Sequence, residues 1–535
     1  MTAAVTRRWI MIFSMALGLM LAGLPQVASA QVTAFKQAVA EAAARDADIA
    51  AFYQANEYKS LWTGRSARES QRRTALFKAL ASAGDHGLPV ARYDVSGLQA
   101  QMKAARNARD RGLVEVELSR TFLQYARDLQ TGVLVPSRVH SAIVRQVPYR
   151  DRTSYLVNFS KSAPSSFFKV LAPKTTEYNA LMKEKLRMER MLAQGGYGPK
   201  VPGRALKSGE SGASVVALRN RLIAMGFLKR SNSQTYDNAL QAAVQQFQEA
   251  NGMTADGKVD AGTLSEINKP LQDRLQSVIV AMERERWFNQ ERGERHVLVN
   301  IPDFTAKIVD NGKTTFSTRS VVGANQEDRP TPEFSDVMEY MVINPSWYVP
   351  RSIVVGEYLP ALKRNRNAVR HIEITDRKGR KINRNNVNFA KYTERTFPFA
   401  MRQPPSKGNA LGLVKFMFPN VYNIYLHDTP AKNLFGREVR AYSHGCVRLA
   451  DPFDFAYALL AKQTSDPEGF FQAKLGTGRE SRVNLKSPVP VHIIYRTAFT
   501  TPKGHTQFRR DIYGRDALVW DALSKAGVAL RAVQG

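Results

Sequence analysis

The sequence predicts a multidomain α+β protein, helical in its first half and rich in β-strands towards its end. Apolar residues recur at the spacing of α-helices up to about residue 290. After Arg295 the apolar residues alternate instead with polar ones, which is the period of a β-strand. A chain of 535 residues is also too long for one hydrophobic core. We therefore expect several separately packed domains.

Residues 1–30 have the features of a secretory signal. Arg7 and Arg8 supply the positive start, and Trp9–Leu24 is mostly apolar. Ala28-Ser29-Ala30 fits an A-x-A cleavage site. The alternative is a retained membrane anchor, but the apolar run is short for a span. We expect removal of the segment and a mature chain outside the cytoplasm.

The formal net charge is +30, and loss of Arg7 and Arg8 lowers it to +28. Such a charge is found in nucleic-acid-binding proteins, but export argues against that class. A basic exported protein is attracted instead to anionic polymers or membrane surfaces of the envelope. The charge is spread along the chain, so it favours no single segment.

Residues 31–200 are predicted to be mainly helical. His86 and His140 lie in this region without a second ligand at metal-like spacing, so we interpret both as ordinary polar or capping residues. The clearest apolar helical face is formed by Leu118, Phe122, Tyr125 and Leu129.

A break at Pro199–Gly203 precedes a compact helical unit at 204–270. Apolar spacing predicts helices over 215–225 and 240–247, and Asp260 is placed to cap a last short helix. Spacing alone fits a generic helical spacer as well as a binding module.

Residues 294–500 are predicted to form a β-rich domain after a connecting helix that ends at Trp287. Asn311-Gly312 is a hairpin signal between two of its strands. Residues 501–535 are assigned to a C-terminal extension. The predicted strands are His296–Ile301, Thr305–Val309, Thr315–Val322, Val337–Ile343, Val421–Leu426 and Val489–Tyr495.

The strand pattern is lost between Ser352 and Pro405, where Arg, Lys and Asn become dense. We interpret about 352–410 as an inserted lid. A disordered basic loop is the alternative, but four residues favour a folded lid because they are able to pack together: Ile372, Ile374, Phe389 and Tyr392.

Cys446 is the only cysteine of the chain. A lone cysteine is more often a small buried hydrophobe than a catalyst. Here polar and charged neighbours, among them His444 and Arg448, suit a reactive thiolate better. A second histidine, His427, stands at the end of a predicted strand. Cys446 is therefore a candidate nucleophile with two candidate bases.

The residues around this cysteine resemble the signature of the L,D-transpeptidases. Ser443–Arg448 reads Ser-His-Gly-Cys-Val-Arg, with His427 upstream. The resemblance covers most of the mature chain and is closest to the large Gram-negative subgroup. Its further motifs are Asn344–Pro350, Arg402–Pro405, Asn409–Gly412 and Tyr425–Pro430.

The resemblance implies a helical scaffold domain, a three-helix peptidoglycan-binding module and a β-rich catalytic domain with an inserted lid. For 204–270, Phe247-Gln248, Asn251-Gly252 and Asp256–Val259 together favour the binding module over the spacer. The subgroup also implies a periplasmic location.

Two histidines compete for the role of general base. His444 and Cys446 are alternate residues, so on a strand their side chains would share a face. We take His427 as the base, with a backbone carbonyl holding its second nitrogen, and His444 as a supporting residue. This assignment is a hypothesis.

Further expectations follow from chemistry and from local sequence. The backbone at Gly445, with that of Cys446, is the expected oxyanion hole, because glycine permits amides to point inward. Arg448 suits either a substrate carboxylate or a structural salt bridge. Asp451-Pro452 is expected to begin a helix after the motif. Candidate residues of the donor groove, each able to pack in the core instead, are Tyr340, Trp347 and Tyr348.

The family resemblance implies an acyl transfer between peptidoglycan stems. Cys446 attacks a tetrapeptide stem after the L-centre of meso-diaminopimelate, D-Ala leaves, and the amine of a second stem forms a 3–3 cross-link. Carbapenems are expected to acylate the thiol. Alternatives are an L,D-carboxypeptidase or endopeptidase, or a transpeptidase that anchors a protein to the wall.

No metal, nucleotide or redox cofactor is implied, because the chain has neither a phosphate loop nor a clustered ligand set. The expected partner is peptidoglycan, possible further partners are envelope enzymes of its synthesis, and nucleic acid is not expected. The acceptor and the oligomeric state are left open by the sequence.

Overall fold

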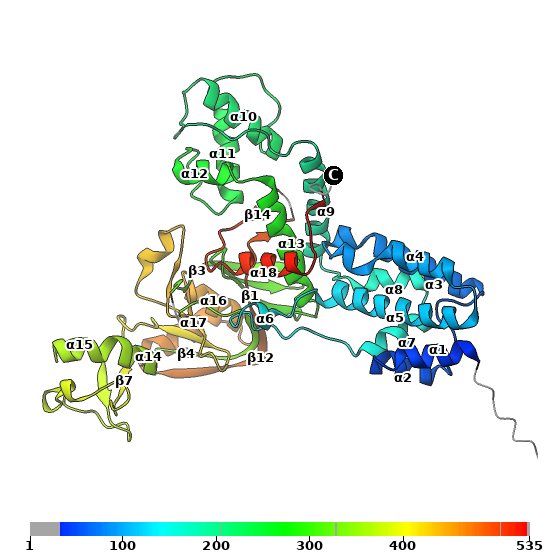
Figure 1. Cartoon of the computed structure of the whole chain (residues 1–535). Helices are drawn as coiled ribbons and strands as arrows, with labels where there is room; N and C mark the ends of the chain where they lie inside the picture. Colours follow the sequence, from blue (N-terminus) through cyan, green and yellow to red (C-terminus); the bar gives the residue numbers. More distant parts are fainter. Residues whose placement is uncertain (1–32, 204, 327–328, 503, 532–535) are drawn as a thin grey trace, which may run out of the picture. The chain divides into compact units, whose positions relative to one another are not determined.

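The computed structural model describes residues 33–203, 205–326, 329–502 and 504–531 and shows a multidomain α+β chain (Figure 1). The expected signal at 1–30 lies outside these residues. Two compact units are distinguished, one comprising residues up to Ser70 with Ser96–Arg120, and one comprising the remainder. Among the described residues, no helix combines the length and apolar character needed to cross a membrane.

The first unit is helical and is organised around one buried carboxylate. Glu115 is fully buried and accepts hydrogen bonds from the backbone amides of Trp62 (3.0 Å) and Thr63 (2.8 Å) and from the hydroxyl of Tyr53 (2.8 Å). Its helices are α1 (Ala34–Ala43), α2 (Ala47–Ala55), α4 (Val95–Ala104) and the first parts of α3 (Ala67–Ala81) and α5 (Ala108–Thr131).

The second unit continues with helices up to residue 287. A long helix, α13, packs along α9 and carries Arg284, whose buried guanidinium pairs with Glu333 (2.5 Å) and Asp516 (2.8 Å). These ion pairs join α13 to the residue before strand β4 (Phe334–Ile343) and to helix α18 near the end of the described chain. The helices are α6 (Pro136–Val139), α7 (Arg152–Lys161), α8 (Pro164–Leu171), α9 (Thr176–Ala193), α13 (Leu271–Trp287) and α18 (Arg515–Lys525).

The helical unit predicted after Gly203 is present as three helices around one apolar core. They are α10 (Ala213–Met225), α11 (Asn238–Ala250) and α12 (Ala261–Ile267). The predicted cap is confirmed, because the Asp260 carboxylate accepts the amide of Thr263 at 2.7 Å.

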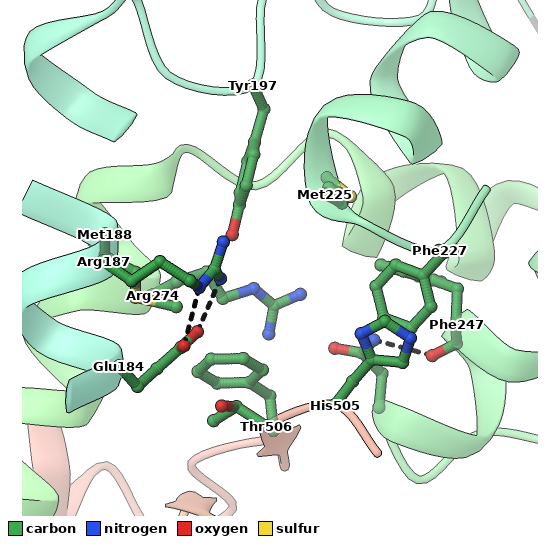
Figure 2. Close-up of a pocket in the computed structure, with 12 residues that line it drawn as sticks. Glu184, Arg187, Met188, Tyr197, Met225, Phe227, Phe247, Arg274, His505 and Thr506 are labelled. Atoms are coloured by element: carbon green, nitrogen blue, oxygen red, sulfur yellow. Dashed lines mark hydrogen bonds and ion pairs between the residues drawn. The ribbon is translucent and has the colours of Figure 1, made fainter. Parts of the chain in front are cut away.

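The residues after 500 are folded against this part of the chain. Strand β14 (Gln507–Phe508) pairs with β13 (Ala498–Phe499), and α18 packs in the same core as α13. Phe227, beyond α10, stacks on His505 with ring centroids 4.0 Å apart. Figure 2 shows Phe227, His505 and Arg274 of α13 among the residues that line a pocket here.

A nine-stranded sheet forms the last domain, in the order β10-β3-β11-β9-β8-β4-β12-β1-β2. Strand β2 also pairs with β3, so the sheet closes on itself. The predicted hairpin turn is confirmed, with positive φ at Asn311 (49°) and Gly312 (75°). The strands are β1 (Arg295–Asn300), β2 (Thr305–Asp310), β3 (Lys313–Gly323), β4 (Phe334–Ile343), β8 (Val414–Met417), β9 (Leu426–His427), β10 (Ala441–Ser443), β11 (Val447–Leu449) and β12 (Ser481–Ile494).

One side of the sheet is packed by α16 (Pro452–Leu460) and α17 (Pro467–Gly476). Phe455 of α16 contacts the rings of Phe316 (5.8 Å) and Phe416 (4.8 Å). The helix begins at Pro452 as predicted, but the Asp451 carboxylate does not cap it and instead accepts the hydroxyl of Thr318 at 2.7 Å.

The predicted strand Val421–Leu426 is wrong except for its last residue. Val421 is 87% exposed in a turn, and only Leu426 and His427 are extended and paired. The reason is the side chain of Asn420, whose oxygen accepts the amides of Tyr422 (3.0 Å) and Ile424 (3.2 Å) and folds the segment into a loop.

The lid is a folded insertion with its own apolar core, and the four residues expected to pack there all do so. It is not free of strands, because a small sheet β5-β7-β6 crosses its base. Its elements are β5 (Trp347–Tyr348), α14 (Arg351–Ile353), α15 (Leu359–Arg364), β6 (Glu373–Thr375) and β7 (Ala400–Gln403).

Candidate active site

Three polar side chains form a row across neighbouring strands of the large sheet. Lys415 on β8 is opposite His427 on β9, and His427 is opposite Arg448 on β11. Their neighbours Leu426 and Val447 point into the apolar core. Because side chains alternate along a strand, the row lies on the other face of the sheet.

Cys446 lies in the bend directly before β11, close enough to Arg448 and Lys415 for their charges to act on its thiol. Its Sγ lies 3.5 Å from the backbone oxygen of Asn423 and contacts Tyr425. Burial raises the pKa of the thiol to about 11, and Tyr425, Arg448 and Lys415 only partly oppose that rise. The resting sulfur is therefore a protonated thiol at neutral pH.

His427 is 4% exposed, and its ring is held by the backbone. Nδ1 lies 2.5 Å from the backbone oxygen of Asp428 and donates a hydrogen bond to it. In that tautomer Nε2 is the nitrogen that carries the free lone pair. Burial lowers the pKa of His427 to about 3, with Arg448 and Lys415 adding to the effect. The imidazole is thus neutral in the resting protein.

His444 faces the lid. Its Nε2 lies 2.7 Å from Oε1 of Glu357, which also pairs with Arg329 at 2.7 Å. The expectation that His444 and Cys446 share a strand face is wrong, because 444–446 form a bend in which Gly445 has φ 111°. The bend turns the two side chains towards different neighbours.

The backbone amide of Gly445 is not free to form the expected oxyanion hole. Its amide donates to Oγ of Ser443 at 3.1 Å, while that hydroxyl donates to the carbonyl of Cys446 at 2.5 Å. The amide of Cys446 has no hydrogen-bond partner among the described residues. The Gly445 oxyanion-hole assignment is therefore corrected: Gly445 shapes the bend, and the free amide is that of Cys446.

The side chain of Arg448 makes no ion pair and no hydrogen bond within the described part of the chain, and its Nε is buried without a partner. Burial lowers the pKa of its guanidinium, and the nearby Cys446 opposes that shift. Of the two roles predicted for Arg448, a structural salt bridge is not found among these residues.

The three groove residues are not brought together. Tyr340 stands three strands from Cys446, roughly 14 Å at the usual strand spacing, and Arg482 covers its ring at 3.7 Å. Tyr348 is 68% exposed. Only Trp347 is near the thiol, since it contacts Tyr425. Tyr340 therefore does not adjoin Cys446, and its place in a donor groove stays a prediction.

Sequence reasoning missed Lys415, Tyr425 and Glu357. Tyr425 is two residues before His427, so alternation on a strand was the available signal for it. Lys415 is recognised only when the register of β8 and β9 is known. Among the described residues, no group of three His, Cys, Asp or Glu side chains is arranged to hold a metal ion.

Comparison with known proteins agrees with this arrangement. Residues 294–493 match the family described as "L,D-transpeptidase catalytic domain". Residues 47–184 match "Scaffold domain", and residues 211–267 match "Putative peptidoglycan binding domain".

A "Putative L,D-transpeptidase" of Haemophilus influenzae is 30% identical over 237 residues, which is 43% of this chain and 47% of that protein. The chain thus spans about half the length of this curated relative. Among solved structures, an L,D-transpeptidase from Stackebrandtia nassauensis has a TM-score of 0.22 and 14% identity, over 56% of this chain and 97% of that one. One from Mycobacterium smegmatis has a TM-score of 0.19 and 12% identity, over 38% and 58%.

The matched ranges follow one another in the order scaffold, peptidoglycan-binding and catalytic domain, and the row of Lys415, His427 and Arg448 lies inside the last of them. Residues 294–493 of this chain thus match the L,D-transpeptidase catalytic domain family, and they follow ranges that match a scaffold domain and a peptidoglycan-binding domain.

Proposed function

We propose that this chain is a periplasmic L,D-transpeptidase that forms 3–3 cross-links in peptidoglycan through an acyl-enzyme on Cys446. The observation that carries the proposal is that the single thiol lies directly before β11, the strand that pairs with β9 and its His427, whose Nδ1 is fixed on the Asp428 carbonyl. The family match of residues 294–493 supports the same activity.

The first half-reaction acylates the thiol. Nε2 of His427 takes the proton from Sγ of Cys446 as sulfur attacks the carbonyl carbon between the L-centre of residue three and D-Ala. The amide of Cys446 donates to the resulting oxyanion. Collapse of that intermediate breaks the peptide bond, and His427 returns its proton to the departing amine of D-Ala.

The second half-reaction uses the amine of another stem. That amine attacks the thioester carbonyl, His427 accepts the proton that the amine loses, and the sulfur leaves and is reprotonated. The products are the new amide and the free thiol. Water in place of the amine gives hydrolysis through the same steps, which is the carboxypeptidase alternative.

Arg448 is assigned to the carboxylate of the departing D-Ala. It follows Cys446 by two residues, and its guanidinium is unpaired among the described residues. A guanidinium binds a carboxylate through two parallel hydrogen bonds, which would fix the scissile bond over the sulfur.

The products made from disaccharide tetrapeptides test this function. We expect the full chain to release D-Ala and to form a dimer whose mass equals two donors minus one D-Ala, and the Cys446→Ala variant to do neither. Tripeptide monomers without dimers would identify a hydrolase. Absence of both products would overturn the proposed activity.

A further inference from the structure

We infer that Lys415 is a second carboxylate-binding residue of the active site and reads the side-chain carboxylate of residue three of the donor stem. The inference rests on the proposed function and extends it from the bond that is broken to the kind of stem that is chosen.

Lys415 is a cation that the protein itself leaves uncompensated. Its ammonium makes no ion pair and no hydrogen bond among the residues that the structure describes. Its nearest recorded group is the ring of Tyr425, whose centroid lies 6.0 Å from Nζ, the outer limit for a cation–π contact. Glu480, a carboxylate whose charge acts on Lys415, accepts the backbone amide of Ser346.

Burial makes that isolation costly. The pKa of Lys415 is lowered by loss of solvent, with Glu480 and Cys446 opposing the shift. A half-buried ammonium without a partner is destabilising in the free protein. An unpaired cation that lowers stability in the free protein is typical of a binding site, where the ligand supplies the opposite charge.

The position of Lys415 relative to Arg448 indicates how the donor stem would lie across the sheet. Lys415 and Arg448 stand one strand away from His427 on opposite sides, so their backbones are about 10 Å apart on one face. With D-Ala on Arg448, the rest of the donor runs towards Lys415. A second carboxylate on the residue-three side chain is then on the correct side of the acyl carbon.

The donor stem has two carboxylates that fit this chemistry. One is on the side chain of diaminopimelate at position three, and the other is the α-carboxylate of residue two when that residue is linked through its side chain. We assign Lys415 to the first, because that side chain branches from the acylated residue itself and so stays next to His427.

Three disaccharide tetrapeptides distinguish these sources: one unmodified, one with the residue-three side-chain carboxylate amidated, and one with the residue-two carboxylate amidated. The kcat/KM for D-Ala release is measured for the full chain, for Lys415→Met and for Lys415→Arg. Lys307→Met is the matched control, since Lys307 lies on β2, away from the row.

We expect the unsubstituted chain to prefer the unmodified stem over the residue-three amide by about 10-fold or more, the usual effect of losing a charged hydrogen bond. Lys415→Met should remove that preference, mainly through KM, and should slow D-Ala release from the unmodified stem more than it slows acylation by a small β-lactam. Lys415→Arg should restore part of the preference, and Lys307→Met should resemble the unsubstituted chain.

Equal slowing of all three stems and of the β-lactam by Lys415→Met would overturn the inference, because Lys415 would then act only through His427. A preference confined to the residue-two amide would overturn the assigned carboxylate. Should Lys415→Met fail to fold, equal rates of the unsubstituted chain on the first two stems would still refute it. Failure to release D-Ala from any stem would refute the proposed function instead.

Discussion

His444 Nε2 is hydrogen-bonded to Glu357 Oε1 at 2.7 Å, although His444 is only two residues from the candidate nucleophile. Glu357 belongs to the lid and also pairs with Arg329. The histidine of the Ser-His-Gly-Cys motif is thereby directed to the lid, whereas His427 lies on β9, which pairs with the strand that follows Cys446.

Replacement of the two histidines should have unequal effects. His427→Ala removes the neutral imidazole that the proposed mechanism uses as its base, so acylation by a β-lactam should slow by about 100-fold or more. His444→Ala should slow it by less than about 10-fold, because it removes a lid contact. Stopped-flow or mass-resolved acylation kinetics measure both rates. If His444→Ala were folded but inactive while His427→Ala stayed active, His444 would be the general base and His427 the supporting residue.

Glu357→Gln should loosen the lid. The change removes the charge that holds both His444 and Arg329, and partly exposed pairs of this kind contribute up to about 1 kcal/mol. Hydrogen–deuterium exchange over 354–362 should therefore accelerate by about two- to fivefold. Glu394→Gln, at an exposed lid glutamate, is the matched control. Identical exchange in the two variants would show that Glu357 does not hold the lid.

Gly445→Ala should damage both stability and acylation. Gly445 has φ 111°, and an added Cβ would lie 3.0 Å from Cδ1 of Ile424. Such a conformation costs an L-residue about 1–3 kcal/mol, and its relief would move the Cys446 amide. We expect a lower Tm and at least about tenfold slower acylation. Gly436→Ala, where a Cβ meets nothing within 4 Å, should change neither property. Unchanged acylation in Gly445→Ala would refute the role of the bend.

Stability should fall as the pH decreases from 6.5 towards 4. Burial lowers the pKa of His86 to about 4, of His427 to about 3 and of His492 to about 4. Since each has an ordinary pKa near 6.5, the unfolded chain binds these protons first, and the loss at pH 5 is about 2 kcal/mol per histidine. Calorimetry between pH 7.5 and 5 measures it. A Tm that does not fall over this range would contradict the buried neutral state.

Local patterns predicted much of the fold. The helices around Asp260 and the hairpin at Asn311-Gly312 depend on caps and turns that neighbouring residues determine. The loop after Asn420 was missed because one side-chain oxygen replaces the strand hydrogen bonds there. The pattern of apolar residues does not show that a side chain competes with the strand for these backbone hydrogen bonds.

The residues of the candidate site that belong to the sequence motif could be predicted. Those that reach the site only through the pairing register of the strands could not. Cys446 and His427 were found from the motif. Lys415 joins them only because β8 pairs with β9 in one of several registers that the sequence allows. Glu357 lies 87 residues before His444. Contacts at such separations depend on how the whole insertion packs, which no local pattern determines.

The mass of the protein trapped during turnover tests the central claim most directly. After rapid acid quenching with a tetrapeptide donor, we expect intact-protein mass spectrometry to show an adduct equal to the donor minus D-Ala, and peptide mapping to place it on Cys446. The adduct should be absent from Cys446→Ala. Turnover of the donor without an adduct on Cys446, or with an adduct on another residue, would contradict covalent catalysis by this cysteine.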